Sequence, residues 1–186
     1  ITGPHPGTVY GDRSTEIDQR YYYQISAVDS SENESERSGV FSAVRKISLI
    51  ISEIMNNPSA VSDEHGEWIE LYNRNPFSVY LNGWVIKDND SDSLMIPEVW
   101  IPEDIPVIQP YSYFILGVNN DTSANGGIHL DFAYSRDDLN LGNSEDEIIL
   151  YNPNGQEIDR VEYDNGQTFP DPNGKSMELI YFMYDN

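Results

Sequence analysis

Residues 67–73 alternate between apolar positions and positions that carry larger or more polar side chains. Ile69 and Leu71 fall on one face of this alternation. The opposite face carries Trp68, Glu70 and Tyr72. A period of two is typical of a β-strand, because successive side chains of an extended chain point to opposite sides. The Asn-Arg-Asn-Pro stretch at residues 73–76 favours a turn after this strand, since Asn tolerates turn conformations and Pro has no N–H to donate.

Further apolar segments are extended in character and are separated by turn signals. They span residues 47–54, 81–87, 113–118, 148–151, 157–163 and 177–184. The connection at residues 97–110 contains four prolines, so we expect its Ile and Val side chains, with Trp100, to form short edge strands. No helix is predicted, although residues 135–141 would fit one turn, and residues 119–127 have the composition of a flexible loop. Short strands joined by Asn, Asp, Gly and Pro clusters predict an all-β sandwich or barrel.

The first 45 residues are predicted to form a separate piece of the chain, before a domain at residues 46–186. Residues 21–29 and 40–44 have the pattern of two strands. Their expected buried face holds Tyr21, Tyr23, Ile25, Val40 and Phe41. Because two strands alone are marginal in water, residues 1–45 should either pack on the rest of the chain or pair with a second copy. We favour a homodimer through residues 1–45, since a partial domain offers edges that a copy of itself can complete.

The chain is strongly acidic, with 32 Asp and Glu against 10 Lys and Arg and a formal net charge of −22. Such a surface repels phosphates and anionic lipid head groups, so we predict no nucleic-acid partner. The absence of cysteine excludes disulfides and thiolate zinc sites. No run of about 18 apolar residues is present, so no membrane insertion is expected. The sequence starts without a signal peptide, and we expect it to be part of a longer protein.

One acidic loop has a spacing that suits calcium. Asp88, Asp90 and Asp92 place three carboxylates at alternate positions, and calcium binds six to eight oxygens in a flexible geometry. The complete EF-hand pattern fails, because Ser93 replaces the required Gly and Val99 replaces the bidentate Glu. A solvated turn is the simpler interpretation, and a calcium site at these three aspartates is the alternative. No other cofactor is predicted.

The remaining polar residues do not form the pattern of an active site. The carboxylates Glu53, Glu67 and Glu70 are interpreted as surface groups on an exposed sheet face, where no cleft would hold a carboxylate pair for glycoside hydrolysis. The histidines at positions 5, 65 and 129 lack metal-ligand spacing, and no serine has a nucleophile-elbow context. We therefore predict no catalytic residue and no enzymatic activity.

Aromatic residues are abundant, at 12% of the chain with 13 tyrosines. Exposed rings can stack on sugars or anchor a protein interface. The candidate ligand or interface residues are Trp68, Tyr72, Tyr21 and Tyr23, with Tyr22 and residues 181–184 as further surface candidates. Alternating strands also need aromatic rings inside the fold, so Trp68 and Trp84 are expected to be half-buried packing residues.

Three motifs in order resemble the opening of a lamin tail domain of the form found in secreted bacterial proteins. They are Ile-Ser-Glu-Ile at residues 51–54, Gly-Glu-Trp-Ile-Glu-Leu-Tyr-Asn at 66–73 and Leu-Asn-Gly-Trp-Val-Ile-Lys-Asp at 81–88. Later motifs continue the resemblance at residues 116–117, 141–144, 147–152 and 154–159. The resemblance covers about residue 46 to the end and implies an immunoglobulin-like sandwich without enzymatic activity. Residues 1–45 resemble the last two strands of a fibronectin type III domain, through the aromatic strand and the Ala-Val-Asp and Asn-Glu-Ser stretches that follow it.

Together these features predict a non-enzymatic binding or structural module of an exported or cell-surface multidomain bacterial protein. Its partner would be a protein or a polysaccharide, or it would position neighbouring domains. One alternative is a carbohydrate-binding module with exposed aromatic rings and a structural calcium. Another alternative is an accessory domain of a secreted hydrolase or nuclease.

Overall fold

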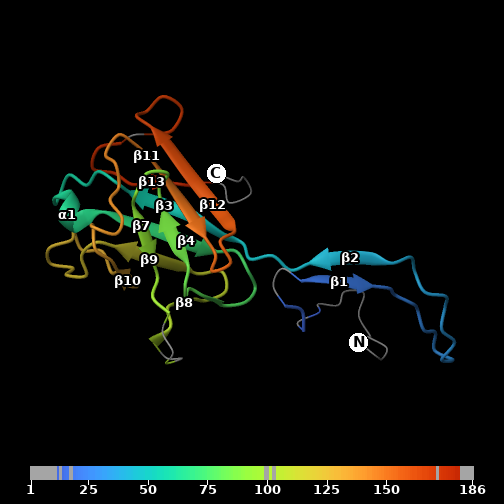
Figure 1. Cartoon of the computed structure of the whole chain (residues 1–186). Helices are drawn as coiled ribbons and strands as arrows, with labels where there is room; N and C mark the ends of the chain where they lie inside the picture. Colours follow the sequence, from blue (N-terminus) through green and yellow to red (C-terminus); the bar gives the residue numbers. More distant parts are fainter. Residues whose placement is uncertain are drawn as a thin grey trace. The chain divides into compact units, whose positions relative to one another are not determined.

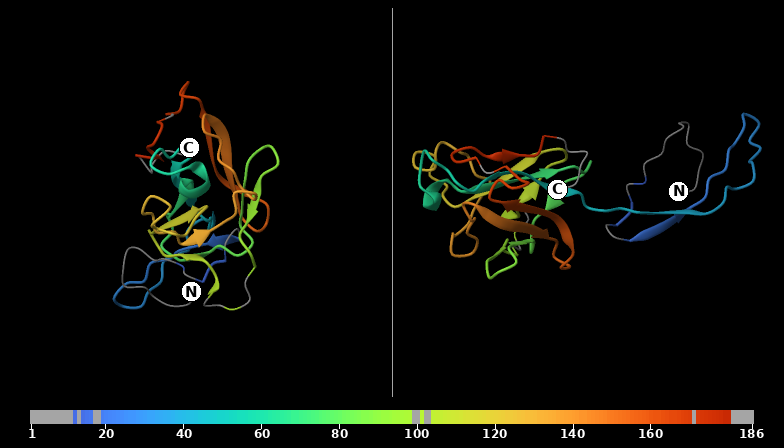
Figure 2. Two further views of the ribbon diagram at one scale, coloured as in Figure 1. Left: turned by 90° about the vertical axis from the view of Figure 1, so that its left-hand side faces the viewer. Right: turned by 90° about the horizontal axis from the view of Figure 1, so that it is seen from above.

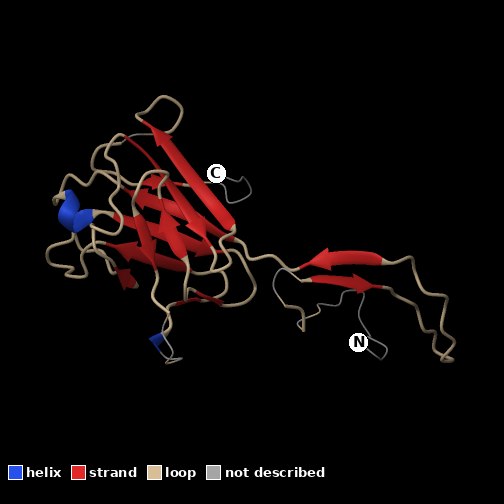
Figure 3. Cartoon of the chain, viewed as in Figure 1, coloured by secondary structure: helices blue, strands red, loops and turns tan. Residues whose placement is uncertain are grey.

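The computed structural model describes residues 12, 14–16, 19–98, 101, 104–170 and 172–180. The chain divides into two compact units, Ile1–Ile47 and Ser48–Asn186. Strands make up most of the regular structure in each unit (Figure 1, Figure 3). No helix within the described ranges is long and apolar enough to cross a membrane.

Two sheets form the larger unit. The first contains β3 (Leu49–Met55), β4 (Trp68–Asn73), β9 (Tyr113–Gly117), β10 (Phe132–Ala133) and β13 (Met177–Glu178), in the order β10-β9-β4-β3-β13. The second contains β6 (Val85–Lys87), β7 (Ser93–Met95), β11 (Glu145–Tyr151) and β12 (Glu157–Asp164), in the order β12-β11-β6-β7. A short separate pair joins β5 (Val79–Tyr80) to β8 (Val107–Ile108), and a single helical turn, α1 (Asp63–Gly66), precedes β4.

The core lies between the two sheets. The alternating segment becomes β4 at the centre of the first sheet, where it pairs with β3 on one side and β9 on the other. Its inward residues Ile69 and Leu71 are fully buried, as are Ile86 and Leu150 of the second sheet. β12 lies over β3, so the sheets are stacked face to face (Figure 2). Burial of apolar surface, at roughly 25 cal/mol per Å², holds the layers together. The predicted all-β, immunoglobulin-like sandwich is confirmed.

Several predicted elements differ in extent from those observed. The last predicted strand is shorter in the described residues, with β13 at residues 177–178 and one further hydrogen bond from Leu179 N to Ser52 O at 2.9 Å. Residues 181–184 and Trp100 lie outside the described residues. The proline-rich connection forms the short strand β8, as predicted. The helical turn α1 was not predicted, because four residues are too few to give a helical period.

The loop at residues 119–127 is better organised than its composition suggests. Asn125 is buried at 4% exposure, and its Nδ2 donates to the carbonyl oxygens of Asn119 (2.8 Å) and Ile128 (2.7 Å). Its Oδ1 accepts the backbone N–H groups of Gly127 and Ile128. One amide therefore closes this loop from the inside, which its composition alone does not indicate.

The smaller unit contains one two-stranded sheet, in which β1 (Arg20–Tyr23) pairs antiparallel with β2 (Phe41–Val44). The ring of Tyr23 stacks on the ring of Phe41, with centroids 5.5 Å apart. The expected buried face is not buried, since Ile25 is 66% exposed, Val40 64% and Phe41 51%. In the described part of this unit no second layer covers the apolar face of the two strands.

Candidate functional site

The three aspartates predicted as calcium ligands lie in the loop between β6 and β7. Asp88 Oδ1 accepts hydrogen bonds from the backbone N–H groups of Asp90 at 2.9 Å and Asp92 at 3.0 Å. Asp92 Oδ2 accepts the backbone N–H of Asn140 at 3.0 Å. In the described part of the chain, no group of three or more His, Cys, Asp or Glu residues is arranged to hold a metal ion. Calcium binding at this loop stays a prediction.

The two aromatic candidates of β4 differ in exposure. Trp68 is only 8% exposed, so the expectation of a half-buried ring is wrong. Leu130 packs over Gly117, the β9 residue paired with Trp68, and a Cβ at that glycine would lie 2.8 Å from Leu130 Cδ2. Tyr72 is partly exposed, and its ring lies 4.7 Å from the ring of Tyr113, which is 50% exposed. This tyrosine pair therefore offers more surface to a ligand than the tryptophan does.

Tyr21 and Tyr23 lie in β1 of the smaller unit and are half-buried. Tyr21 Oη accepts the backbone N–H of Glu16 at 2.9 Å. Tyr23 Oη donates to Asp12 Oδ2 at 3.2 Å. Between them, Tyr22 is 69% exposed and is the more accessible ring. Their role as interface residues stays a prediction.

Glu67 is the charged residue that departs most from its expected place. It was expected on an exposed sheet face, but it is 1% exposed directly before β4, where it caps α1. Arg136 makes a two-point contact with its carboxylate, from Nε to Oε2 at 3.2 Å and from Nη2 to Oε1 at 2.9 Å. The backbone N–H of Leu141 lies 3.5 Å from Oε2. A buried carboxylate needs such a partner, because desolvation without one costs several kcal/mol.

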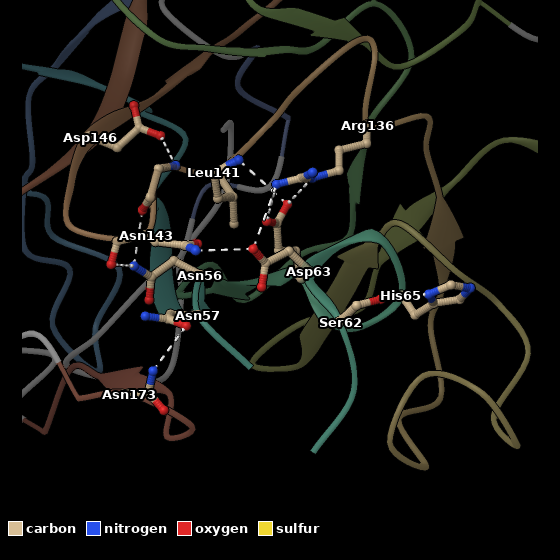
Figure 4. A network of polar contacts seen from close by, with 12 residues as sticks. Asn56, Asn57, Ser62, Asp63, His65, Arg136, Leu141, Asn143, Asp146 and Asn173 are labelled. Atoms are coloured by element: carbon tan, nitrogen blue, oxygen red, sulfur yellow. Dashed lines mark hydrogen bonds and ion pairs between the residues drawn. The ribbon is translucent and has the colours of Figure 1, made fainter. Parts of the chain in front are cut away.

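The ion pair belongs to a wider polar network at one end of the sandwich (Figure 4). Asp63 Oδ2 lies 3.9 Å from Arg136 Nη2 and accepts a hydrogen bond from Asn143 Nδ2 at 3.0 Å. Asn56 Nδ2 donates to the carbonyl oxygens of Gly142 at 3.0 Å and Asn143 at 3.2 Å. The network thus joins the ends of β3 and α1 to the chain between β10 and β11.

Burial also affects the acid groups beside this network. Asp146 Oδ2 accepts the backbone N–H of Gly142 at 2.6 Å, and burial raises the pKa of this carboxyl group although that hydrogen bond opposes the rise. Tyr163 Oη donates to the carbonyl oxygen of Gly142 at 2.6 Å. Burial raises the pKa of Tyr163, with a further contribution from the Asp146 charge. The two side chains converge on one glycine and fix the chain that leads into β11.

The network does not have the arrangement of a hydrolytic site. Burial raises the pKa of Glu67, while the hydrogen bonds and charge of Arg136 oppose the rise, so the carboxylate is already engaged. Ser62 and His65 are exposed, and Ser62 Oγ lies 2.9 Å from His65 Nδ1 within the single turn of α1. Nucleophilic catalysis needs a base that is itself oriented by a third group, and no contact of that kind to His65 is present in the described residues.

A second group of carboxylates lies on the outer face of the first sheet. Glu53 of β3 pairs across the strands with Glu70 of β4 and with Glu178 of β13. The Ser176 hydroxyl donates to Glu53, and the Ser52 hydroxyl donates to Glu70 at 2.7 Å. Burial raises the pKa of Glu70, and the charges of Glu53 and Glu178 add to the rise although the Ser52 hydrogen bond opposes it. Neighbouring like charges of this kind destabilise a sheet unless a partner neutralises them.

These pKa shifts predict a stability maximum at mildly acidic pH. Glu67, Glu70 and Asp146 have raised pKa values, so their contribution to stability is complete below the unfolded pKa of about 4 and is lost as pH rises through the native values. The pKa of Asp164 is lowered to about 2, mainly by hydrogen bonds from Thr168 and Phe169. Its contribution is present above a pH of about 4 and is lost as pH falls toward 2.

Thermal unfolding followed by circular dichroism is the measurement for this prediction. We expect the Tm to rise from about pH 8 to about pH 5 and to fall below about pH 4. Asp164→Asn should reduce the fall on the acid side while leaving the rise in place. A Tm that increases steadily up to pH 8 would contradict the assignment of the raised pKa values.

Sequence reasoning missed Arg136, which lies 69 residues from Glu67 in a loop. One signal was present, because Arg136 is one of only 10 basic residues and directly precedes two aspartates in an acidic chain. A lone arginine in such surroundings is a candidate partner for a buried carboxylate. The spacing itself could not identify which carboxylate that is.

Comparison with known families gives a match to the Lamin Tail Domain model over residues 43–165, about two thirds of the 186 residues. The matched range includes every strand from β3 to β12 and both partners of the Glu67–Arg136 pair. No curated protein matches the chain.

Proposed function

The chain belongs to the lamin tail domain family, and from this premise we propose that it is a non-enzymatic protein-binding module. We further propose that its parent is an exported or cell-surface multidomain protein of bacterial origin. The resemblance of the motifs in β3, β4 and β6 to the secreted bacterial form supports that location. The formal net charge of −22 suits a highly soluble domain at a cell surface.

The observation that carries the proposed function is the uncovered apolar face of the smaller unit. Ile25, Val40 and Phe41 are each more than half exposed on or beside a two-stranded sheet, and Tyr22 is 69% exposed on its other face. Apolar residues gathered in this way mark an interaction surface. The strands β1 and β2 have no further strand beside them in the described residues, so both also offer backbone groups to a partner.

For this surface we propose pairing with a second copy of the chain through residues 1–45. An identical hairpin has the same apolar side chains and the same open edges, so a two-fold arrangement would satisfy both at once.

Removal of residues 1–45 tests the proposed pairing. We expect the full chain to have twice the monomer mass by light scattering and the shortened chain, beginning at Lys46, to be a folded monomer. In the full chain, Phe41→Asp should also give a monomer, because it places a charge on the contact face. Tyr80→Asp is the matched control, since Tyr80 is 60% exposed on the larger unit and its replacement should leave the dimer intact.

Other results would separate the alternatives. A full chain that is already monomeric, but whose Tm falls by several degrees on shortening, would indicate that the segment docks on its own chain. Unchanged mass and unchanged Tm would contradict both versions and leave residues 1–45 without a binding role.

A second candidate function is binding of a polysaccharide, supported by the tyrosine pair on the first sheet. Tyr113 is 50% exposed beside Tyr72, and Tyr111 is 59% exposed two residues earlier. Aromatic rings on a flat sheet face can stack on sugar rings. Retention of the protein on insoluble polysaccharides, lost in Tyr113→Ala, would favour this function.

An accessory role in a secreted hydrolase or nuclease would be decided by the activity of the neighbouring domains.

A further inference from the structure

A pocket of about 290 Å³ opens at one edge of the sandwich, away from the polar network and the tyrosine pair. Its apolar lining comes from both sheets and from the chain before and after β13. These side chains are Ile51, Ile54, Val161, Phe169, Met177 and Leu179. The volume lies just below the range for ligand pockets, roughly 300–1,000 Å³, and therefore suits one large side chain.

The strands beside this pocket are the terminal strands of their sheets. β13 ends the first sheet and β12 ends the second, and no described strand pairs with the outer edge of either. Leu179 N donates to Ser52 O, toward β3. Because backbone groups alternate in direction along an antiparallel strand, those of Glu178 and Ile180 point to the open edge. An extended peptide can pair with such groups and place alternate side chains in the pocket.

The charges around the pocket indicate which residues a bound partner should carry. Among the described residues its lining includes Glu53 and Glu178 and no basic side chain. Glu178 is exposed, and Glu53 and Glu178 face each other across β3 and β13. Basic residues on a bound strand would neutralise these adjacent like charges, whereas acidic residues would be repelled. Ile180 is 76% exposed at the same edge, which adds apolar surface beside the carboxylates.

We propose that this edge pocket binds an extended segment of a partner protein that carries one large apolar side chain between lysine or arginine residues. The apolar side chain enters the pocket, the segment pairs with the outer edge of β13, and the basic residues contact Glu178 and Glu53. The inference rests on the proposed function as a protein-binding module and names the kind of partner for the larger unit.

Fluorescence anisotropy with a labelled peptide tests this site in the full chain. The probe is acetyl-Lys-Val-Lys-Trp-Lys-Val-Lys-amide at about 0.1 M salt, where long-range charge effects are screened beyond about 10 Å. Replacement of its Trp by Ser should weaken binding at least about tenfold, because the buried anchor is lost. Glu178→Lys should weaken it about tenfold, whereas Glu145→Lys, an equal charge change at the exposed first residue of β11, should change it less than about twofold.

Three results would overturn the proposal. The first is no saturable binding of the Trp peptide, and the second is an equal effect of Glu178→Lys and Glu145→Lys, which would indicate attraction to the net charge alone. The third is that a peptide with the sequence of residues 181–186, Tyr-Phe-Met-Tyr-Asp-Asn, binds as tightly as the Trp peptide. This result would indicate that residues 181–186 of the chain itself fill the pocket. If the peptide does not bind but the full chain is a dimer by light scattering, only the edge-pocket proposal fails. The proposed function then stands, because pairing through residues 1–45 is measured separately.

Discussion

Arg136→Met is expected to destabilise the larger unit by about 3 kcal/mol, because it leaves the buried carboxylate of Glu67 without its partner. Methionine keeps most of the length of the arginine side chain, so the change removes mainly the charge and the hydrogen bonds. The cost is at the lower end for a broken buried pair, since the arginine side chain is 34% exposed to water. Thermal and urea unfolding at pH 7 measure the loss.

Arg160→Met is the matched control for this prediction. The side chain of Arg160 is 32% exposed, nearly the same as that of Arg136, and it also contacts two carboxylates. Its partners are solvent-accessible, with Glu157 42% and Glu162 62% exposed, whereas the Glu67 side chain is 0% exposed. An exposed pair contributes at most about 1 kcal/mol, so this control should be nearly neutral. Equal losses in the two variants would show that the burial of Glu67 does not govern the effect.

The pH dependence of Arg136→Met gives an independent check. Arg136 opposes the rise of the Glu67 pKa, so its removal should raise that pKa further. Protonation then removes the unpaired charge, and the stability lost at pH 7 should be partly recovered as pH falls toward 5. Glu67→Gln in the same background should recover stability at pH 7 as well, because a neutral amide needs no counter-charge. A loss that is independent of pH would contradict this account.

The central strand was predictable because its pattern is local. Ile69 and Leu71 alternate with larger residues, and that period alone identifies both the strand and its buried face. The turns at Gly83 and Gly155 were equally predictable, because both glycines follow Asn and adopt positive φ angles of 69° and 73°. Local rules therefore suffice where each residue's environment is set by its own strand or turn.

The polar end of the sandwich could not be predicted in this way. Glu67 was expected among the surface carboxylates, although strict alternation puts it on the same side of the strand as the buried Ile69 and Leu71. The expectations for Glu67 and the adjacent Trp68 both failed, because distant segments cover these two residues at the beginning of the stretch. Arg136 reaches Glu67 from 69 residues away, and Leu130 packs over the strand next to Trp68. Knowing which loops cover a sheet requires the tertiary fold, which periodicity does not contain.

Asparagine gives a second example of what composition leaves open. Asparagines were expected only as turn formers, yet several are almost fully buried, at 0–4% exposure. These are Asn56, Asn73, Asn75, Asn125 and Asn152. An amide can donate two hydrogen bonds and accept two, so one buried asparagine can satisfy the backbone groups of a whole turn. The residue type predicts the turn correctly, but whether its side chain faces inward depends on which carbonyl groups lie nearby.

Asn73 is the clearest example of a buried asparagine that holds a turn. Replacing its side-chain NH2 group by an oxygen atom is expected to cause a large loss of stability. Asn73 is 0% exposed at the end of β4, and the two N–H groups of its Nδ2 are shared among three carbonyl oxygens, those of Phe77 (2.9 Å), Ile108 (3.1 Å) and Gln109 (2.9 Å). Its Oδ1 accepts hydrogen bonds from both the backbone N–H and the side chain of Asn75. The amide thereby connects the end of β4 to the segment that carries β8.

Asn73→Asp replaces the donor group by an oxygen that faces three carbonyl oxygens. At pH 7 the introduced carboxylate would be buried beside acceptors only, and burial of unsatisfied groups costs about 1–3 kcal/mol each. We therefore expect a loss of about 4 kcal/mol or more and a fall in Tm of roughly 10 °C. Asn120→Asp makes the same chemical change at an exposed position and should have little effect. Thermal unfolding of both variants at pH 7 measures the difference.

Acidification separates this mechanism from a general loss of packing. Burial among carbonyl oxygens should raise the pKa of the introduced carboxyl group well above its ordinary value of about 4. Below that raised pKa the group is neutral and its O–H can donate to one of the three carbonyl oxygens again, so Asn73→Asp should regain stability relative to the parent chain as pH falls from 7 to about 5. A deficit that stays constant over this range, or a Tm equal to that of Asn120→Asp at pH 7, would show that the three hydrogen bonds of Asn73 do not hold this corner of the fold.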